Sequence, residues 1–130
     1  YTLAVDRGNS RLARLYNPFH PAVVRLLDLI IRAGNAAGIE VSVCGEFASN
    51  PLGAFLLIGM GADSLSVAPS SLAEIKKVIR AVTQADAREA VGDALAASTP
   101  DAVAAGLTAR LGKVLDLGKF NGSWNLSDRD

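Results

Sequence analysis

The fold of this chain is decided by one short stretch, Ile39-Glu40-Val41-Ser42-Val43-Cys44-Gly45-Glu46. Aliphatic residues alternate with Glu, Ser and Cys over its first six positions, which is the period of a β-strand with one buried face. Cys44 therefore ends the strand on its polar face, directly before a glycine turn. The carboxyl ends of strands in α/β proteins are where ligands bind. The thiol is a candidate proton donor or nucleophile, and the alternative is a small buried side chain, because free cysteines are often buried.

Helical patterns lie on both sides of this strand, and a second strand follows. His20-Pro21 starts a helix that Gly38 ends, with Pro at its first position. Pro51 opens another helix that runs to Met60. The stretch Ser64–Val67 alternates like the first strand. After it, Ser71-Leu72-Ala73-Glu74 matches the capping box of a third helix.

Helical periodicity continues to the end of the patterned region. The third helix places Ile75, Val78, Ile79 and Val82 on one face, and Arg11 to Tyr16 is a short helical stretch. Two further helices are predicted from about Ala85 to Ala97 and from Pro100 to about Leu117. The tail after Gly118 is polar and rich in turn residues, with Phe120 and Trp124 as isolated anchors. Between the second helix and the second strand, Gly59-Met60-Gly61 is a helix end rather than a phosphate loop, and Asp63 is expected to be a turn residue.

Helices that alternate with strands through short links indicate βα units and a parallel sheet. Two strands alone do not make a stable parallel sheet, because such sheets are covered on both faces. A closed (β/α)₈ barrel takes about 250 residues, so this chain corresponds to the last quarter of one. Small polar residues on the second face of both strands suit a barrel that holds a charged ligand.

Composition excludes several classes of function. The 13 basic and 13 acidic residues give a net charge of +0, which argues against a nucleic-acid-binding face and a polybasic membrane patch. No apolar run reaches the ~20 residues of a membrane span. One cysteine cannot form an intrachain disulfide framework and fits a reducing, cytoplasmic location. The chain starts at Tyr1 within a patterned segment, so we expect it to be a fragment of a longer protein.

Four motifs in order resemble the phosphoenolpyruvate–protein phosphotransferases, which are enzyme I of the bacterial sugar phosphotransferase system and its nitrogen-related paralogue. They are Tyr1-Thr-Leu-Ala-Val-Asp-Arg-Gly-Asn9, Asn17-Pro-Phe-His-Pro-Ala-Val23, Cys44-Gly-Glu-Phe-Ala48 and Gly59-Met-Gly-Ala-Asp-Ser-Leu-Ser66. The resemblance implies the C-terminal part of a phosphoenolpyruvate-binding (β/α)₈ TIM barrel, with the last two strands and a helical extension. It divides the chain into βα units (1–82), C-terminal helices packing on the barrel (83–118) and a polar tail (119–130). It also places residues 1–6 in a loop, although they alternate like a strand.

The resemblance implies roles for two residues. Arg7 matches an arginine that grips the substrate phosphate, and a guanidinium suits this because it bonds phosphate oxygens in pairs. The alternative for Arg7 is a pair with Asp6 in a solvated turn. Cys44 matches the general acid that protonates the enolate at carbon to give pyruvate, which requires a protonated thiol. Asn9, Gly45 and Glu46 are possible supporting residues, Gly45 because it lets the backbone approach a ligand.

The resemblance also limits what this chain can supply. His20 matches a structural position, because the family's phosphohistidine lies in a separate N-terminal domain, which would also contact the histidine phosphocarrier protein. The Mg²⁺ ligands are expected upstream, so the isolated chain should be inactive. Exposed strand edges and helix faces predict a homo-oligomer. The alternatives are a fragment of a pyruvate phosphate dikinase or phosphoenolpyruvate synthase, or a non-catalytic dimerisation module.

Overall fold

The computed structural model describes residues 1–6 and 8–120. This part of the chain contains two β-strands, five α-helices and three 3₁₀-helices. In chain order they are η1 (Ser10–Leu15), α1 (Pro21–Ala36), β1 (Ser42–Cys44), α2 (Pro51–Met60), β2 (Ser64–Ser66), η2 (Pro69–Ser71), α3 (Leu72–Ala81), α4 (Gln84–Ala96), α5 (Pro100–Leu111) and η3 (Leu117–Lys119). The predicted alternation of helix and strand, followed by helices alone, is confirmed. No helix in the described ranges is both long and apolar enough to cross a membrane.

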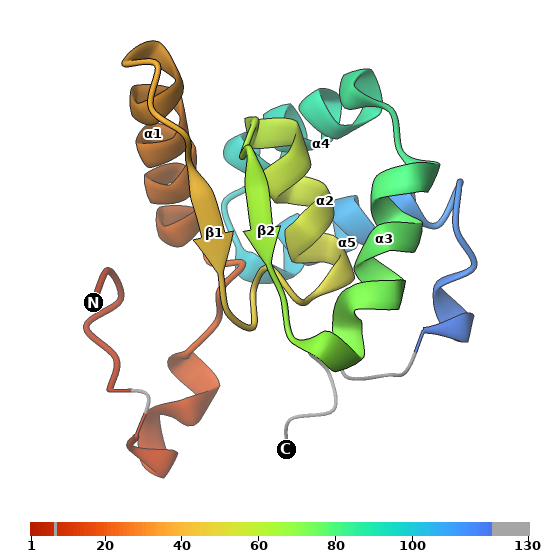
Figure 1. The fold of residues 1–130 in the computed structure, drawn as a ribbon. Helices are drawn as coiled ribbons and strands as arrows, with labels where there is room; N and C mark the ends of the chain where they lie inside the picture. The colour runs from red at the N-terminus through yellow and green to blue at the C-terminus, as the bar shows by residue number, and fades with distance from the viewer. Residues whose placement is uncertain (7, 121–130) are drawn as a thin grey trace.

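The two strands lie side by side and run parallel, as the alternation predicts. Their register pairs Ser42 with Ser64, Val43 with Leu65 and Cys44 with Ser66. Val43 and Leu65 are half-buried and pack against the hydrophobic core, so the helices cover that face of the sheet. The opposite face carries the small polar residues and faces the viewer in Figure 1, where no helix lies over it.

Helix α2 forms the centre of the core. Its sequence, Pro-Leu-Gly-Ala-Phe-Leu-Leu-Ile-Gly-Met, is apolar on every side, and it packs against α3, α4 and α5. A helix that is hydrophobic all round is stable only when it is surrounded. Gly59 permits the closest of these contacts, because a Cβ at that position would collide with the backbone oxygen of Ala87 on α4. The residues that follow α3 therefore share one core with the strands and α2.

The first strand is shorter than predicted. Pairing was expected from Ile39, but β1 begins at Ser42, and Ile39 is 64% exposed. The cause lies in Asp63, whose carboxylate Oδ2 accepts a hydrogen bond from the Val41 N–H at 2.7 Å. The Asp63 N–H in turn donates to the Val41 carbonyl at 3.0 Å. Both backbone groups of Val41 are thus bonded to the residue before β2, and the ladder starts one residue later.

Two helix boundaries also differ from the prediction. Ser71 makes no side-chain cap for α3, because η2 leads straight into α3 and holds Ser71 in helical geometry (φ −92°, ψ −10°) rather than the extended geometry of a cap. The last helix ends at Leu111 instead of about Leu117. The chain turns after Gly112, and the Asp116 carboxylate accepts a hydrogen bond from the Gly118 N–H at the start of η3.

Of the smaller predictions, one is wrong and others are confirmed. Ile79, predicted on the buried face of α3, is 48% exposed because only Ile75 and Val78 of that helix reach the core. Gly61 ends α2 in the left-handed conformation (φ 88°), as predicted for a helix end. Residues 1–6 form a turn and no strand, as the family resemblance implies. Phe120 is buried in the core, and Trp124 lies outside the described residues.

Candidate functional site at the carboxyl end of the sheet

Cys44 is the last residue of β1, and its side chain is exposed. This confirms the predicted placement on the polar face of the strand and excludes the alternative of a small buried side chain. Its neighbour across the sheet is Ser66, the last residue of β2, which is also exposed. A thiol and a hydroxyl therefore share the carboxyl end of a parallel sheet, which is where ligands bind in α/β folds.

The loop that follows Cys44 is held in place at three points. Gly45 turns the chain with φ +95°, a conformation that costs other residues energy, and no atom lies close to where a Cβ would be. Phe47 packs on Phe19, the residue two positions before α1, with ring centroids 5.2 Å apart. Ser49 Oγ accepts a hydrogen bond from the Ala68 N–H at 3.1 Å. The loops after β1 and β2 are thus tied together around the thiol.

A hollow of about 300 Å³ opens beside Cys44. It lies between the N-terminal segment, the start of α1 and β1, which are neighbours in Figure 1. Its lining is mostly apolar and includes a few hydroxyl and amide side chains: Tyr1, Thr2, Leu3, Val5, Tyr16, Asn17, Pro18, Val23, Leu27, Val43, Cys44 and Phe47. None of the side chains that line it is charged. The hollow suits an uncharged, carbon-rich group rather than a phosphate.

None of the other predicted site residues that the structure describes lines the hollow beside Cys44. Arg7 lies outside the described residues. Asn9 lies in a turn, where its side-chain oxygen accepts a hydrogen bond from the Arg11 N–H at 3.0 Å. Gly45 and Glu46 are exposed and do not line the hollow. The roles proposed for these residues therefore stay predictions.

His20 takes the structural position that was predicted for it. It is the N-cap of α1, and its Nδ1 accepts a hydrogen bond from the Ala22 N–H at 3.1 Å. This bond satisfies one of the amide groups that the first turn of a helix leaves unpaired. The ring is not among the groups that line the hollow beside Cys44.

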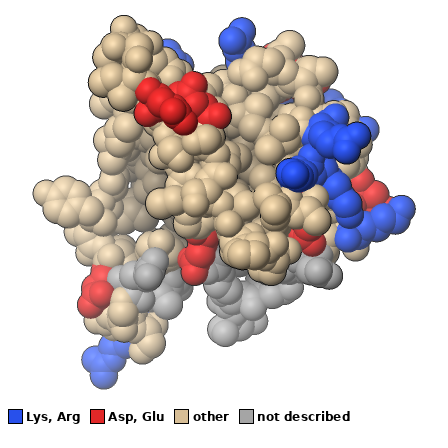
Figure 2. All heavy atoms as spheres, in the orientation of Figure 1, with Lys and Arg blue, Asp and Glu red and all other residues tan. Residues whose placement is uncertain are grey.

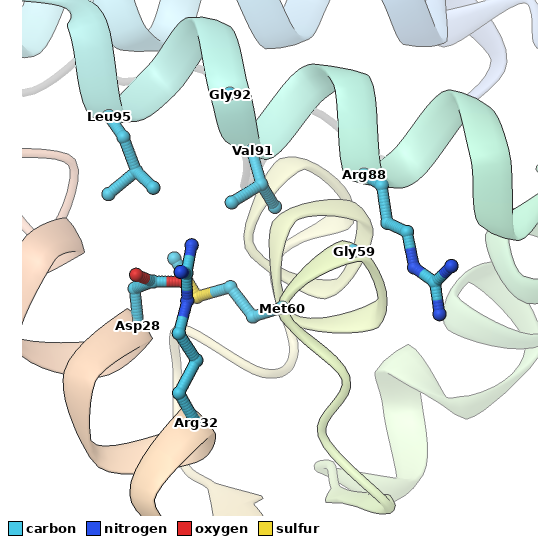
Figure 3. A pocket seen from close by; sticks show the side chains of 8 residues that line it. All are labelled: Asp28, Arg32, Gly59, Met60, Arg88, Val91, Gly92 and Leu95. Atoms are coloured by element: carbon cyan, nitrogen blue, oxygen red, sulfur yellow. The ribbon is translucent and has the colours of Figure 1, made fainter.

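A second cavity, of about 290 Å³, lies between α1, α2 and α4. Figure 3 shows Arg32 beside Asp28 and Met60, whereas Arg88 lines the cavity from α4 on the other side of Gly59. Arg32 Nε bonds Asp28 Oδ1 at 2.9 Å, so these two charges neutralise each other. No thiol, hydroxyl or imidazole lines this cavity, and it offers less chemistry than the strand ends.

Charge is unevenly spread on the face that carries the sheet. Figure 2 shows this face as largely uncharged, with Lys and Arg gathered over α3 at its edge. The exposed basic residues of that helix are Lys76, Lys77 and Arg80. Within residues 1–6 and 8–120, no group of three or more His, Cys, Asp or Glu side chains gathers to hold a metal ion. Mg²⁺ is bound through several oxygen ligands, so the described residues do not fit this ion by themselves.

Sequence reasoning missed several residues of this site. Ser49 and Asp63 fix the ends of the two strands, but each bond joins residues about twenty positions apart. Tyr1 and Tyr16 reach the hollow only because the N-terminal segment folds back beside β1. The position of Ser66 was available in principle, because Ser64-Leu65-Ser66 alternates in the same phase as the residues that end in Cys44.

Comparison with known proteins shows which family the chain belongs to. Residues 1–84 match the family model described as PEP-utilising enzyme, PEP-binding domain. The phosphoenolpyruvate-protein phosphotransferase of Haemophilus influenzae is 45% identical over 95 residues, which is 73% of this chain and 16% of that protein. Its namesake from Borreliella burgdorferi is 45% identical over 83 residues, or 64% of this chain and 14% of that protein.

A relative with a different name shares the same region. The phosphoenolpyruvate synthase of Pyrococcus furiosus is 42% identical over 79 residues, which is 61% of this chain and 10% of that protein. The chain thus spans about a sixth or less of the length of these three relatives. The family resemblance that the four motifs carry is confirmed, and the chain belongs to the PEP-utilising enzymes, with residues 1–84 in their PEP-binding domain.

Proposed function

We propose that this chain is the part of a phosphoenolpyruvate–protein phosphotransferase that carries the general acid. In this proposal a longer protein transfers the phosphoryl group of phosphoenolpyruvate to one of its own histidines and then to a histidine carrier protein. The observation that carries the proposal is the exposed thiol of Cys44 at the carboxyl end of a parallel strand, inside the family match. The names of two relatives at 45% identity support this activity over others.

The chemistry assigned to Cys44 is a single proton transfer. When the phosphorus–oxygen bond of phosphoenolpyruvate breaks, the phosphoryl group leaves to the histidine and an enolate remains. The enolate carbon takes the thiol proton, so a C–H bond forms, the S–H bond breaks, and pyruvate and a thiolate result. The thiolate regains its proton from water. An apolar hollow beside the thiol supports this role, because it offers room for the methylene carbon and no carboxyl or imidazole side chain lines it.

The phosphate end of the substrate needs positive charge that the side chains lining the hollow do not supply. We propose that Arg7 supplies part of it, because a guanidinium bonds two phosphate oxygens at once and stabilises the charge that develops during transfer. Asp6 and Asn9 turn the chain on either side of Arg7: the Asp6 carboxylate accepts a hydrogen bond from the Gly8 N–H at 2.8 Å. The Mg²⁺ ligands of the reaction belong, in this proposal, to other parts of the longer protein.

The architecture proposed for the longer protein is a (β/α)₈ barrel that encloses the polar face of the sheet. Among the residues that the structure describes, two parallel strands with helices on one face only, and a second face of small polar residues, support this proposal. The outer side of α1 also exposes Leu26, Leu29 and Ile30 to solvent. Such a surface suits contact with a neighbouring βα unit or a second copy, so we propose a homo-oligomer, in a reducing, cytoplasmic location.

The test is the replacement of Cys44 in the full-length protein that contains this chain. General acid–base catalysis contributes about 10²- to 10⁴-fold, so Cys44→Ala should lower the turnover of phosphoenolpyruvate by at least about 100-fold. Binding of phosphoenolpyruvate, measured by calorimetry, should change little because the phosphate contacts remain. A variant that turns over at the wild-type rate would rule out the general-acid role.

The second candidate function is ATP-dependent synthesis of phosphoenolpyruvate. It is favoured by the 42% identity to a phosphoenolpyruvate synthase. Both activities place the same pyruvate chemistry at Cys44, so the thiol does not separate them. Formation of phosphoenolpyruvate from pyruvate and ATP by the full-length protein would establish this second function, whereas phosphorylation of a histidine carrier protein by phosphoenolpyruvate would establish the first.

A further inference from the structure

We propose that Ser66 is a positioning residue for the Cys44 thiol, whose hydroxyl donates a hydrogen bond to the sulfur when the thiol gives up its proton. The meaning of this bond for catalysis rests on the general-acid role proposed above. The bond itself does not, because it concerns the chemistry of the thiol alone.

The register of the sheet places the two groups next to each other. Cys44 pairs with Ser66 across a parallel ladder, and neighbouring strands are about 4.8 Å apart. Paired residues of adjacent strands point to the same face, and here that face is the one away from the core, because Val43 and Leu65 point inward. A turn about one side-chain bond in each residue brings oxygen and sulfur within hydrogen-bond reach.

Bonds on both sides of the pair fix this register. Before the strands, the Asp63 carboxylate and N–H hold both backbone groups of Val41. Beyond the strand ends, Ser49 Oγ holds the Ala68 N–H at 3.1 Å. The two-residue shift that would separate Cys44 from Ser66 breaks both attachments. The short ladder therefore presents the thiol and the hydroxyl together despite having only three residue pairs.

Neither side chain is committed elsewhere. Within the described ranges, neither the Cys44 thiol nor the Ser66 hydroxyl has a hydrogen-bond partner, and both residues are exposed. The titratable side chains around the thiol are Tyr1 and Tyr16, which line the adjoining hollow, and Glu46, two residues further along the chain. No Lys, Arg or His side chain lines the hollow, and Ser66 is the residue whose hydroxyl the register places beside the sulfur.

The chemical consequence follows from the direction of proton transfer. A thiol that delivers its proton to carbon becomes an anion, and a hydrogen bond to an anion is about twice as strong as one between neutral groups. Ser66 therefore stabilises the product side of the proton transfer more than the starting thiol. Interactions that strengthen along the reaction raise kcat rather than lower KM.

The sole cysteine of this chain makes the test direct. The rate of alkylation by iodoacetamide reports the thiolate fraction of Cys44, because thiolate is the nucleophile. Ser66→Ala should lower that rate about threefold or more at pH 7.5, the loss expected from one hydrogen bond of ordinary net strength at an exposed site. The rates of variant and wild type should converge at high pH, where every thiol is ionised. Ser66→Thr keeps the hydroxyl and should restore most of the rate.

Ser64→Ala is the matched control. Ser64 lies on the same face of β2, two residues earlier, but pairs with Ser42 instead of Cys44. Its replacement removes a hydroxyl from the same strand and should leave alkylation unchanged. Equal rates for Ser66→Ala and wild type across the pH range would overturn the proposal. Equal slowing by Ser64→Ala and Ser66→Ala would also overturn it, because loosening of the sheet would then explain the effect.

A parallel measurement separates this inference from the proposed function. In the full-length protein, Ser66→Ala should lower kcat for phosphoenolpyruvate about threefold or more and leave KM unchanged, to the extent that Cys44 acts as the acid. A slowed alkylation together with full turnover of Cys44→Ala would keep the Ser66–Cys44 bond and reject the general-acid role. Unchanged alkylation together with a dead Cys44→Ala variant would do the opposite.

Discussion

At the scale of single residues, the chemistry of the site depends on whether each polar side chain already has a hydrogen-bond partner. Cys44 is free to react because the strand ends exposed and the loop turns away at Gly45. His20 is a more familiar catalytic residue, but its Nδ1 is occupied by the Ala22 N–H. The difference between a reactive and a structural side chain here is the hydrogen-bond partner, not the residue type.

His20 supports a prediction at this scale. His20→Ala should destabilise the chain by about 1 kcal/mol, because the first turn of α1 loses its cap. The urea midpoint of unfolding measures this effect, and His20→Asn, which restores a capping oxygen, should recover it. Phosphoenolpyruvate turnover by the full-length protein should stay near the wild-type rate in both variants. Loss of turnover with unchanged stability would show that His20 takes part in the chemistry.

The positions and roles of some residues could be predicted from the sequence alone, and those of others could not. The alternating period placed Cys44 on the exposed face, because a two-residue period leaves only two choices. The cap at His20 was equally local. The prediction that Ser71 caps α3 was wrong, because the capping motif carries no information about η2, which runs directly into α3. The bonds of Ser49 and Asp63 depend on the register of two strands, which no local pattern contains.

At the scale of elements, the closest contact is the one between α2 and α4. A Cβ at Gly59 would meet the Ala87 backbone oxygen and the Val91 side chain. Gly59→Ala should therefore destabilise the chain by about 1–3 kcal/mol through overpacking. Gly92→Ala on α4 is the control, because nothing lies near its Cβ, and it should stabilise by about 0.5–1 kcal/mol. Thermal unfolding measures both, and destabilisation of the same size in each would contradict this packing.

The contact between α4 and α5 is partly electrostatic. Arg110 Nε and Nη2 bond Asp93 Oδ2, at 2.7 and 2.6 Å, and Arg110 Nη1 bonds Glu89 at 3.0 Å. These hydrogen bonds, first to Asp93 and then to Glu89, raise the pKa of Arg110. A raised pKa means that the contribution to stability is complete below the ordinary pKa of a guanidinium and is lost only as the pH rises through the raised value. Between pH 6 and 9 this group should add no pH dependence.

Replacement of Arg110 tests that account. Arg110→Gln should lower Tm slightly in dilute buffer and by less in 1 M NaCl, because salt screens exposed charges. Lys119→Gln is the comparison, since its pair with Asp116 is more exposed and spans only three residues. The shift for Lys119→Gln should be smaller at every salt concentration. A salt-independent loss for Arg110→Gln would show that packing, and not charge, holds α5 on α4.

At the scale of the whole molecule, the exposed face of α1 predicts self-association. Leu29 and Ile30 are 64% and 51% exposed on the same helix. We expect the chain to form dimers or larger species at micromolar concentrations, as measured by light scattering, and Leu29→Glu to shift it toward monomer. Val114→Glu should have no effect, because Val114 is similarly exposed (49%) but lies beyond α5, away from α1. A chain that stays monomeric would contradict this expectation.

The order of the elements was predictable because the signals of each βα unit are local: residues alternate along the strands, and prolines mark the starts of helices. The layer that would cover the second face of the sheet could not be predicted from local patterns. The two strands are three residues each, and their second face has no covering layer within the described residues. The barrel therefore remains a proposal about a longer protein, supported by the family match to residues 1–84.

The most direct test of the central claim follows the proton itself. In the full-length protein, a general acid at Cys44 working in reverse should remove a proton from the methyl group of pyruvate, so wild type should exchange methyl deuterium with water. Proton NMR measures this exchange without any phosphoryl transfer. Cys44→Ala should slow it by at least about 100-fold. Exchange at the wild-type rate in Cys44→Ala would show that another group moves the proton.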